Sequence, residues 1–325
     1  MASASNIINR DALDASLTTF RTVFEELFTS AGNDAIVNAF CAEVSAEGGQ
    51  TYQALFQDFL GTWQEFLGAR EVSPSRVSAL NITLKTYAQS MSIPRKDFQY
   101  DKIGTVAARI RTFLSAQKSY KSAILHSAML AVNSGEGTVG YDGVNLINTA
   151  HPNAPAGGTQ SNKTTSALSP LTFRSGYEAM TSFLRENGEP FNVVPKYLIV
   201  GPKNRDIAME ITKADMRGRS VANTGLEAGA AVVASAGVSN VQNGLVEPLI
   251  SERLVGTLDD YWYIVGEGPG GAKPVMYLKG MDPMEQIDTD PNSANVQRTD
   301  AFTFGLIADG AFAAGAWPCI YGGIL

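Results

Sequence analysis

The stretch KIGTVAARIRTFLSAQKSYKSAILHSAMLAVN, residues 102–133, carries the strongest periodic apolar pattern in the chain. Its apolar side chains recur three or four positions apart, at Ile103, Val106, Ile110, Phe113, Tyr120 and Ile124, with Gln117 filling one step. That spacing aligns them on one face of a helix, and no proline interrupts it before Asn133-Ser134-Gly135. We therefore expect one helix about 45 Å long, at about 1.5 Å per residue, roughly three times the average helix length.

Helical spacing also dominates residues 11–70, upstream of this stretch. Apolar residues recur there at Leu13, Leu17, Phe20, Phe24, Leu27 and Phe28, and later at Leu55, Phe59, Trp63 and Phe66. Such stripes need a surface to cover them. Two covers are open: ordinary packing within the chain, or a neighbouring subunit on which these helices lie as an arm.

Residues 72–98 change to strand spacing. Leu80, Ile82 and Leu84 alternate with polar residues, and a second extended piece, residues 91–98, contains Pro94. The pattern predicts a two-stranded excursion. A lone hairpin is only marginally stable in water, so we expect its apolar face to rest on another element.

The rest of the chain mixes helix and strand patterns. Residues 136–169 form a long polar loop, and Ser169-Pro170 begins a helix that ends at Asn187-Gly188. A buried strand at 193–200 precedes a short helix around Ile211. Residues 261–265 and 275–278 flank a glycine-rich turn, which predicts a hairpin. The chain is therefore expected to be an α+β protein.

Composition limits the classes of function. The chain has 325 residues, 44% of them hydrophobic, and a net charge of -7. A protein that grips nucleic acid usually has a basic excess, and none is visible here. No signal-peptide pattern begins the sequence, and no apolar run reaches the ~18 residues of a membrane span. We expect a soluble product of the cytoplasm with no membrane contact.

Residue patterns of catalytic and metal sites are missing from the sequence. The chain has two histidines, His126 and His151, and two isolated cysteines, Cys41 and Cys319. No nucleophile elbow, zinc-protease motif or EF-hand loop occurs. The glycines of residues 266–271 lack the Lys-Ser/Thr ending of a phosphate-binding loop. Asp288, Asp290 and Asp300 fit a solvated loop better than a calcium site. We expect no catalytic residue, cofactor or metal.

Several segments, in their order, resemble the Mu-like phage major head subunit family. They are NITLKTYA (81–88) followed by IPRKD (93–97), YDGVNL (141–146) leading to AHP (150–152), VVPKYLIV (193–200), and FTFG (302–305) with GAW (315–317). The N-terminal part matches poorly, so the resemblance covers roughly residues 70–325. It implies a major capsid protein with the Hong Kong 97-like fold of tailed phages.

The resemblance also implies a division of the chain. Residues 1–70 would be a helical N-terminal arm, 71–100 the extended E-loop, and 101–190 a peripheral domain built on the long spine helix. Residues 191–252 would be the axial domain, and 253–325 a β-rich return to both domains. Expected interface residues are Leu80, Ile82, Leu84, Lys85, Arg95 and Lys96 in the E-loop, and Phe20, Phe24, Phe28 and Trp63 in the arm.

Implied partners follow from this family. Copies of the chain would form the hexamers and pentamers of an icosahedral virion shell, assembled in the cytoplasm of a bacterial host. The shell would enclose double-stranded DNA without sequence-specific binding. A scaffold protein, a maturation protease and a portal would act in trans. The nearest alternative is an encapsulin, a compartment shell of the same fold; a hydrolase using His151 and a tail-tube protein are more distant.

Overall fold

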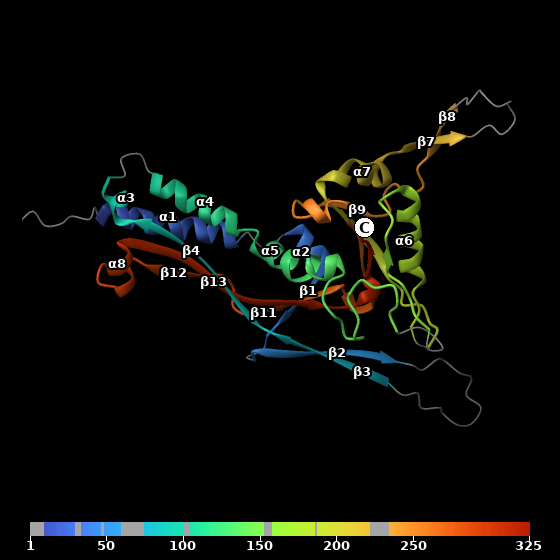
Figure 1. Cartoon of the computed structure of the whole chain (residues 1–325), viewed down its shortest axis with the longest axis horizontal. Coiled ribbons are helices and arrows are strands. Elements are labelled where there is room, and N and C mark those ends of the chain that lie inside the picture. Colours follow the sequence, from blue (N-terminus) through green and yellow to red (C-terminus); the bar gives the residue numbers. More distant parts are fainter. Residues whose placement is uncertain are drawn as a thin grey trace, which may run out of the picture.

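A single long strand, β13 (Ala301–Ala314), runs along the elongated molecule and links its two ends (Figure 1). The computed structural model describes residues 10–29, 34–46, 49–59, 75–100, 105–152, 158–185, 187–221 and 234–325. Along one edge β13 pairs antiparallel with β4 (Lys85–Pro94). Along its other edge it pairs with β12 (Met284–Asp288) and then β11 (Val275–Lys279), and β1 (Cys41–Ser45) lies parallel to β11.

Helices cover one face of this sheet at the β12 end. They are α1 (Arg10–Thr29), α3 (Arg95–Tyr100), α4 (Thr105–Gln117) and the short α8 (Ala294–Thr299). The alternation in β13 sends Phe302, Phe304 and Leu306 toward them, where they form one buried cluster with Val106 and Ile110. The helical stripe predicted for Val106 and Ile110 is therefore confirmed as core.

A second sheet builds the other end of the molecule. Its strand order is β5-β14-β10-β6-β9. The strands are β5 (Lys163–Thr164), β14 (Ile320–Gly323), β10 (Trp262–Glu267), β6 (Val194–Val200) and β9 (Glu247–Ile250). Residues 262–265 of β10 are buried on both faces of this sheet, since it is a central strand with helices on each side.

Two sets of helices flank that second sheet. On one face lies α6 (Pro170–Ser182), whose N-terminus is capped by Ser169 and whose Gly176 contacts the rings and methyl groups of Tyr321 and Ile264. On the other lies α2 (Ala35–Phe40), where Phe40 packs 6.0 Å from the ring of Tyr263. A third helix, α7 (Arg205–Lys213), packs on β9 and β6. The strand and helices expected at 193–200, 169–187 and around Ile211 are confirmed, although α6 ends earlier, at Ser182.

The long helix expected at 102–133 is wrong as a single element. After α4 the chain turns at Lys118-Ser119, resumes as α5 (Tyr120–Leu125), and continues as the π-helix η1 (His126–Leu130) and the 3₁₀ turn η2 (Val132–Gly135). At the break, Nη2 of Arg253 donates to the hydroxyl and the carbonyl oxygen of Ser119, 2.9 and 3.3 Å away. This contact comes from far along the chain, so local spacing does not reveal it.

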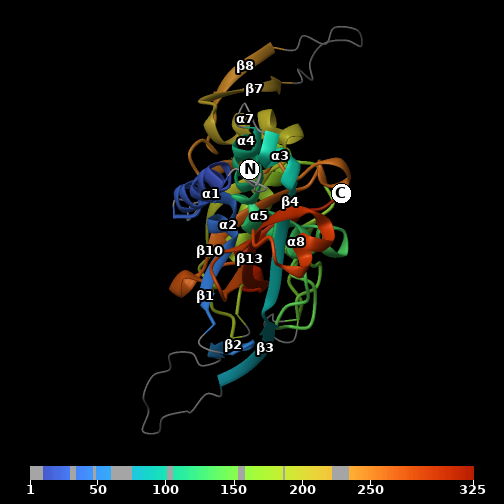
Figure 2. The same ribbon diagram turned by 90° about the vertical axis from the view of Figure 1, so that its left-hand side faces the viewer.

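Two hairpins project from the molecule on opposite sides (Figure 2). One pairs β2 (Thr51–Phe59) with β3 (Ser75–Thr83) along nine positions. The other pairs β7 (Met216–Val221) with β8 (Ala234–Ser239). The remaining short 3₁₀ turns are η4 (Pro202–Asn204), η5 (Gly256–Leu258), η6 (Pro269–Gly271) and η7 (Trp317–Cys319).

Three strand expectations need correction. Residues 41–45 and 51–59 are strands, although a helix was expected there. Leu55 and Phe59 fit helical spacing, but the pairing of 51–59 with β3 makes that segment extended. The two extended pieces of 72–98 do not pair with each other: β3 pairs with β2, and β4 with β13. Residues 261–278 form no hairpin, since β10 and β11 belong to different sheets. Gly270 and Gly271 take positive φ in the crossing between them.

Candidate functional site

The β2–β3 hairpin holds three of the residues expected at a subunit interface. Its inner face carries Leu80 and Ile82, and Leu84 follows directly. Ile82 is only 4% exposed and packs with Ala54, Leu278 and Ala311 of the same chain. The apolar face therefore rests on β11 and β13 of its own chain, and the expectation that Ile82 lies at a subunit interface is wrong.

The outer face of the same hairpin carries exposed apolar residues. Leu55 is 55% exposed and Val77 52% exposed. In the register Leu55 lies opposite Ala79, and Gln57 opposite Val77, so both belong to the face that points away from Ile82. The sequence argument missed this face, because it placed Leu55 in a helical run. The candidate contact surface of the hairpin is thus Leu55 and Val77, with inner-face residues serving as its anchor.

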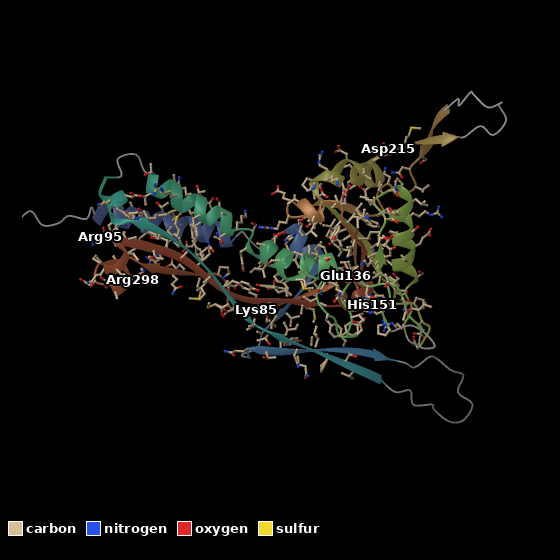
Figure 3. All side chains as sticks on the ribbon, viewed as in Figure 1. Lys85, Arg95, Glu136, His151, Asp215 and Arg298 are labelled. Carbon is tan, nitrogen blue, oxygen red and sulfur yellow. The ribbon has the colours of Figure 1, made fainter. Side chains whose placement is uncertain are left out.

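The three expected interface cations lie at the two ends of β4, with Lys85 at one end and Arg95 and Lys96 at the other. Lys85 begins β4 and Lys96 lies just beyond its end, both exposed. Figure 3 shows Lys85 and Arg95 at opposite ends of the strand. A ten-residue strand spans roughly 30 Å at about 3.3 Å per residue. Arg95 pairs with Asp300 at 3.4 Å. These side chains therefore mark the two ends of β4 and form no common site.

Of the interface residues expected in the N-terminal arm, some lie in the core of the subunit and others lie outside the described residues. Phe20 is fully buried, 5.6 Å from the ring of Phe304 and stacked with Phe24 at 6.4 Å. The expectation that this stripe acts between subunits more than within one is wrong for Phe20, since α1 covers its own sheet. The side chain of Phe28, and Trp63 altogether, lie outside the described residues.

A buried polar network organises the loop between η2 and α6. The imidazole of His151 lies 2.6 Å from Oδ2 of Asp142 through Nδ1, and 3.1 Å from Oδ1 of Asn162 through Nε2. The ring stacks on Trp317 with centroids 4.2 Å apart. In the sequence, the segment 141–152 is notable only through the family resemblance. The network ties this loop to β14 and η7.

A second polar cluster lies beside it (Figure 3). Glu136 accepts from Nζ of Lys163 at 2.5 Å and from Nδ2 of Asn145 at 2.7 Å. Burial tends to raise the pKa of Glu136, but the hydrogen bonds from Lys163 and Asn145 outweigh burial and lower it. The pair fixes the start of the loop to β5, which keeps the loop on the sheet.

Within the described ranges, no three His, Cys, Asp or Glu side chains gather as a metal site would require. Burial raises the pKa of the Cys41 thiol, and raises that of Cys319 to about 12, so both thiols stay protonated. A search of the described helices finds none with the length and apolarity needed to span a bilayer.

Comparisons with known proteins agree with this architecture. The profile of the phage capsid protein family matches residues 77–321. A comparison with curated proteins finds no match. Among solved structures, the bacteriophage JBD30 capsid has a TM-score of 0.51 at 10% identity, over 91% of this chain and 67% of that one.

Two further capsid relatives cover both chains more evenly. The protein from Mycobacterium phage Patience has a TM-score of 0.50 at 12% identity, over 95% of this chain and 86% of that one. The protein from Microbacterium phage Oxtober96 has a TM-score of 0.50 at 11% identity, over 90% of both. These likenesses identify the fold as Hong Kong 97-like, and the family match spans most of the sequence. The chain therefore belongs to the phage capsid protein family and is a structural component of the virion shell.

Proposed function

We propose that this chain is the major head protein of a tailed phage of the Mu-like group. Its copies form the hexamers and pentamers of an icosahedral shell around double-stranded DNA. The observation that carries the proposal is the family match over residues 77–321, which includes most strands of both sheets and most of the hairpin strand β3. The segments 81–97, 141–152, 193–200 and 302–317 support the Mu-like assignment.

The parts of the fold take the following roles in this proposal. The end built on β13, α1 and α4 is the peripheral domain, and the sheet with α6 and α7 is the axial domain, with β7–β8 at its tip. The E-loop is the β2–β3 hairpin, so it begins earlier in the chain than the range 71–100 expected from the sequence. Support comes from its projecting position in Figure 1 and from the exposed Leu55 and Val77 on its outer face.

The subunit has no catalytic role in this proposal, and its partners act in trans. A scaffold protein guides assembly, a protease matures the shell, and a portal occupies one vertex. The net charge of -7 suits a container that holds DNA without gripping its phosphates. Lys85, Arg95 and Lys96, together with the outer face of the E-loop, contribute to contacts between subunits.

Expression of the full chain tests the proposal. Negative-stain images of the purified protein should contain closed icosahedral or tubular shells, because a capsid subunit carries its assembly surfaces with it. Particles from infected or induced cells should contain genomic DNA. Shells filled with a protein cargo would favour the encapsulin alternative, and a small discrete oligomer on sizing chromatography would contradict both.

A further inference from the structure

The sheet around β13 ends in two strands that have a free edge. β4 pairs with β13 alone, and β12 also pairs with β13 alone, on the opposite side. Among the residues that the structure describes, neither strand has a second strand partner. Each therefore presents a row of backbone N–H and C=O groups that another strand can bind.

Between its terminal residues Lys85 and Pro94, the free edge of β4 lacks the features that usually protect an edge strand. Its register with β13 continues over ten positions with no bulge, from Lys85 to Pro94. Between those two residues every side chain is uncharged, and most are exposed. Proteins normally interrupt such an edge with a charge, a proline or a bulge. An unprotected edge of this length indicates a strand that is paired in the functional assembly.

Charge distinguishes the two edges. Segment 85–96, which contains β4, has three cations, Lys85, Arg95 and Lys96, at its ends and no carboxylate. Segment 282–290, which contains β12, has four carboxylates, Asp282, Glu285, Asp288 and Asp290, and no cation. The β12 edge keeps an acidic excess although two of these carboxylates have partners elsewhere: Lys279 at 3.0 Å from Asp282, and Arg21 at 3.2 Å from Glu285.

This distribution selects one pairing. Two β4 edges side by side would bring cations against cations, and two β12 edges would bring carboxylates against carboxylates, which is unfavourable across strands. β4 against β12 brings opposite charges together at both ends, whether the strands run parallel or antiparallel. We propose that the β4 edge of one subunit binds the β12 edge of the next copy, so that their sheets join head to tail around a capsomer.

Such a contact is heterologous, and heterologous contacts generate closed rings when the rotation between copies closes. The inference rests on the proposed shell function and adds which strands meet in it. Lys85 and Lys96 form no ion pair among the described residues of their own chain, which leaves both amines available for a neighbour.

Zero-length carbodiimide cross-linking of assembled shells tests the contact. Shells are assembled from an equal mixture of nitrogen-14 and nitrogen-15 subunits, cross-linked, digested and analysed by mass spectrometry. Peptides that join Lys85 or Lys96 to the carboxylates of 282–290 should be mixed-isotope in about half of cases, the fraction for random neighbours in a ring. The Lys163–Glu136 pair, 2.5 Å apart within one chain, is the matched control and should remain single-isotope.

Charge exchange provides the second measurement. The double variant Lys85→Glu with Lys96→Glu should lose most shell formation, and adding Asp282→Lys with Asp290→Lys should restore it. All four side chains are exposed, so the subunit itself should unfold at the same denaturant concentration.

Normal shells without β4–β12 cross-links, or without any effect of the double variant, would overturn the inference and leave the proposed function standing. A wild-type chain that forms no shell, either alone or together with the scaffold and other head proteins, would overturn both.

Discussion

Nδ1 of His151 lies 2.6 Å from Oδ2 of Asp142, and both side chains are sealed from solvent. The other ring nitrogen faces Oδ1 of Asn162, whose Nδ2 donates to the carbonyl oxygens of Leu146 and Trp317 and so determines the amide orientation. Both ring nitrogens thus face acceptors. These contacts make His151 and Asp142 a hydrogen-bonded pair that solvent does not reach.

Removing one member of this pair should be costly. His151→Ala leaves a buried carboxyl oxygen of Asp142 without its hydrogen-bond partner, and an unsatisfied buried polar group costs about 1 to 3 kcal/mol. We expect that loss in the unfolding free energy of the unassembled subunit, measured by urea denaturation. In the double variant His151→Ala with Asp142→Ala the loss should be smaller than the sum of the two single losses. Additive losses would mean that the two side chains do not interact.

The Glu136–Lys163 pair should make stability depend on pH in a defined direction. The pKa of Glu136 is lowered in the folded chain, so its carboxylate binds protons less readily there than in the unfolded chain. The pair therefore stabilises the fold above the ordinary glutamate pKa, about 4.3, and this stability is lost as pH falls through the lowered folded value.

Lys163→Met should thus reduce the unfolding free energy by on the order of 1 kcal/mol at neutral pH. The difference from wild type should shrink as the pH is lowered below about 4. Denaturation of both proteins across this pH range measures it. A difference that stays constant with pH would contradict the role of the Glu136 carboxylate.

Local sequence patterns predicted the types of several elements but not their partners. The alternation of Leu80, Ile82 and Leu84 correctly indicated a strand, since side chains of one face recur every second residue. It carries no information about the strand opposite, and Ile82 in fact pairs with Tyr52, thirty positions earlier. The covering residues Leu278 and Ala311 lie still farther along the chain.

The helix break at Ser119 and the buried contacts of His151 were not predicted, because both involve residues far apart in the sequence. At the helix break Ser119 accepts hydrogen bonds from Arg253, far along the chain, and no glycine or proline marks the break in the sequence. The buried role of His151 depends on Asp142, Asn162 and Trp317, which are dispersed in sequence. What could be predicted was the α+β class, the helix, strand and helix between residues 169 and 213, and the capsid resemblance. The exposed surface of Leu55 and Val77 could not, because exposure is decided by how β2 pairs with β3.

The first helix should behave as part of the subunit core. Phe20→Ala removes a fully buried ring that contacts Phe304, and such truncations cost about 3 to 5 kcal/mol. We expect a large fall in the thermal unfolding temperature of the unassembled subunit. Thr18→Ala, at an exposed position of the same helix, is the control and should change little. An unchanged melting temperature for Phe20→Ala would assign α1 to a contact between subunits instead.

The outer and inner faces of the β2–β3 hairpin should separate assembly from folding. Leu55→Asp places a charge on the exposed outer face, so the unfolding free energy should stay within about 0.5 kcal/mol of wild type. Shell formation should nevertheless fall sharply, because the charge would have to be buried against a neighbour. Ile82→Asp places the same charge in the cluster with Leu278 and Ala311, and it should destabilise the subunit itself.

Denaturation of unassembled protein and particle counts in negative-stain images provide the two readouts. Normal shells from Leu55→Asp would remove this face from the assembly contact, whereas normal stability of Ile82→Asp would mean that the hairpin does not rest on its own subunit.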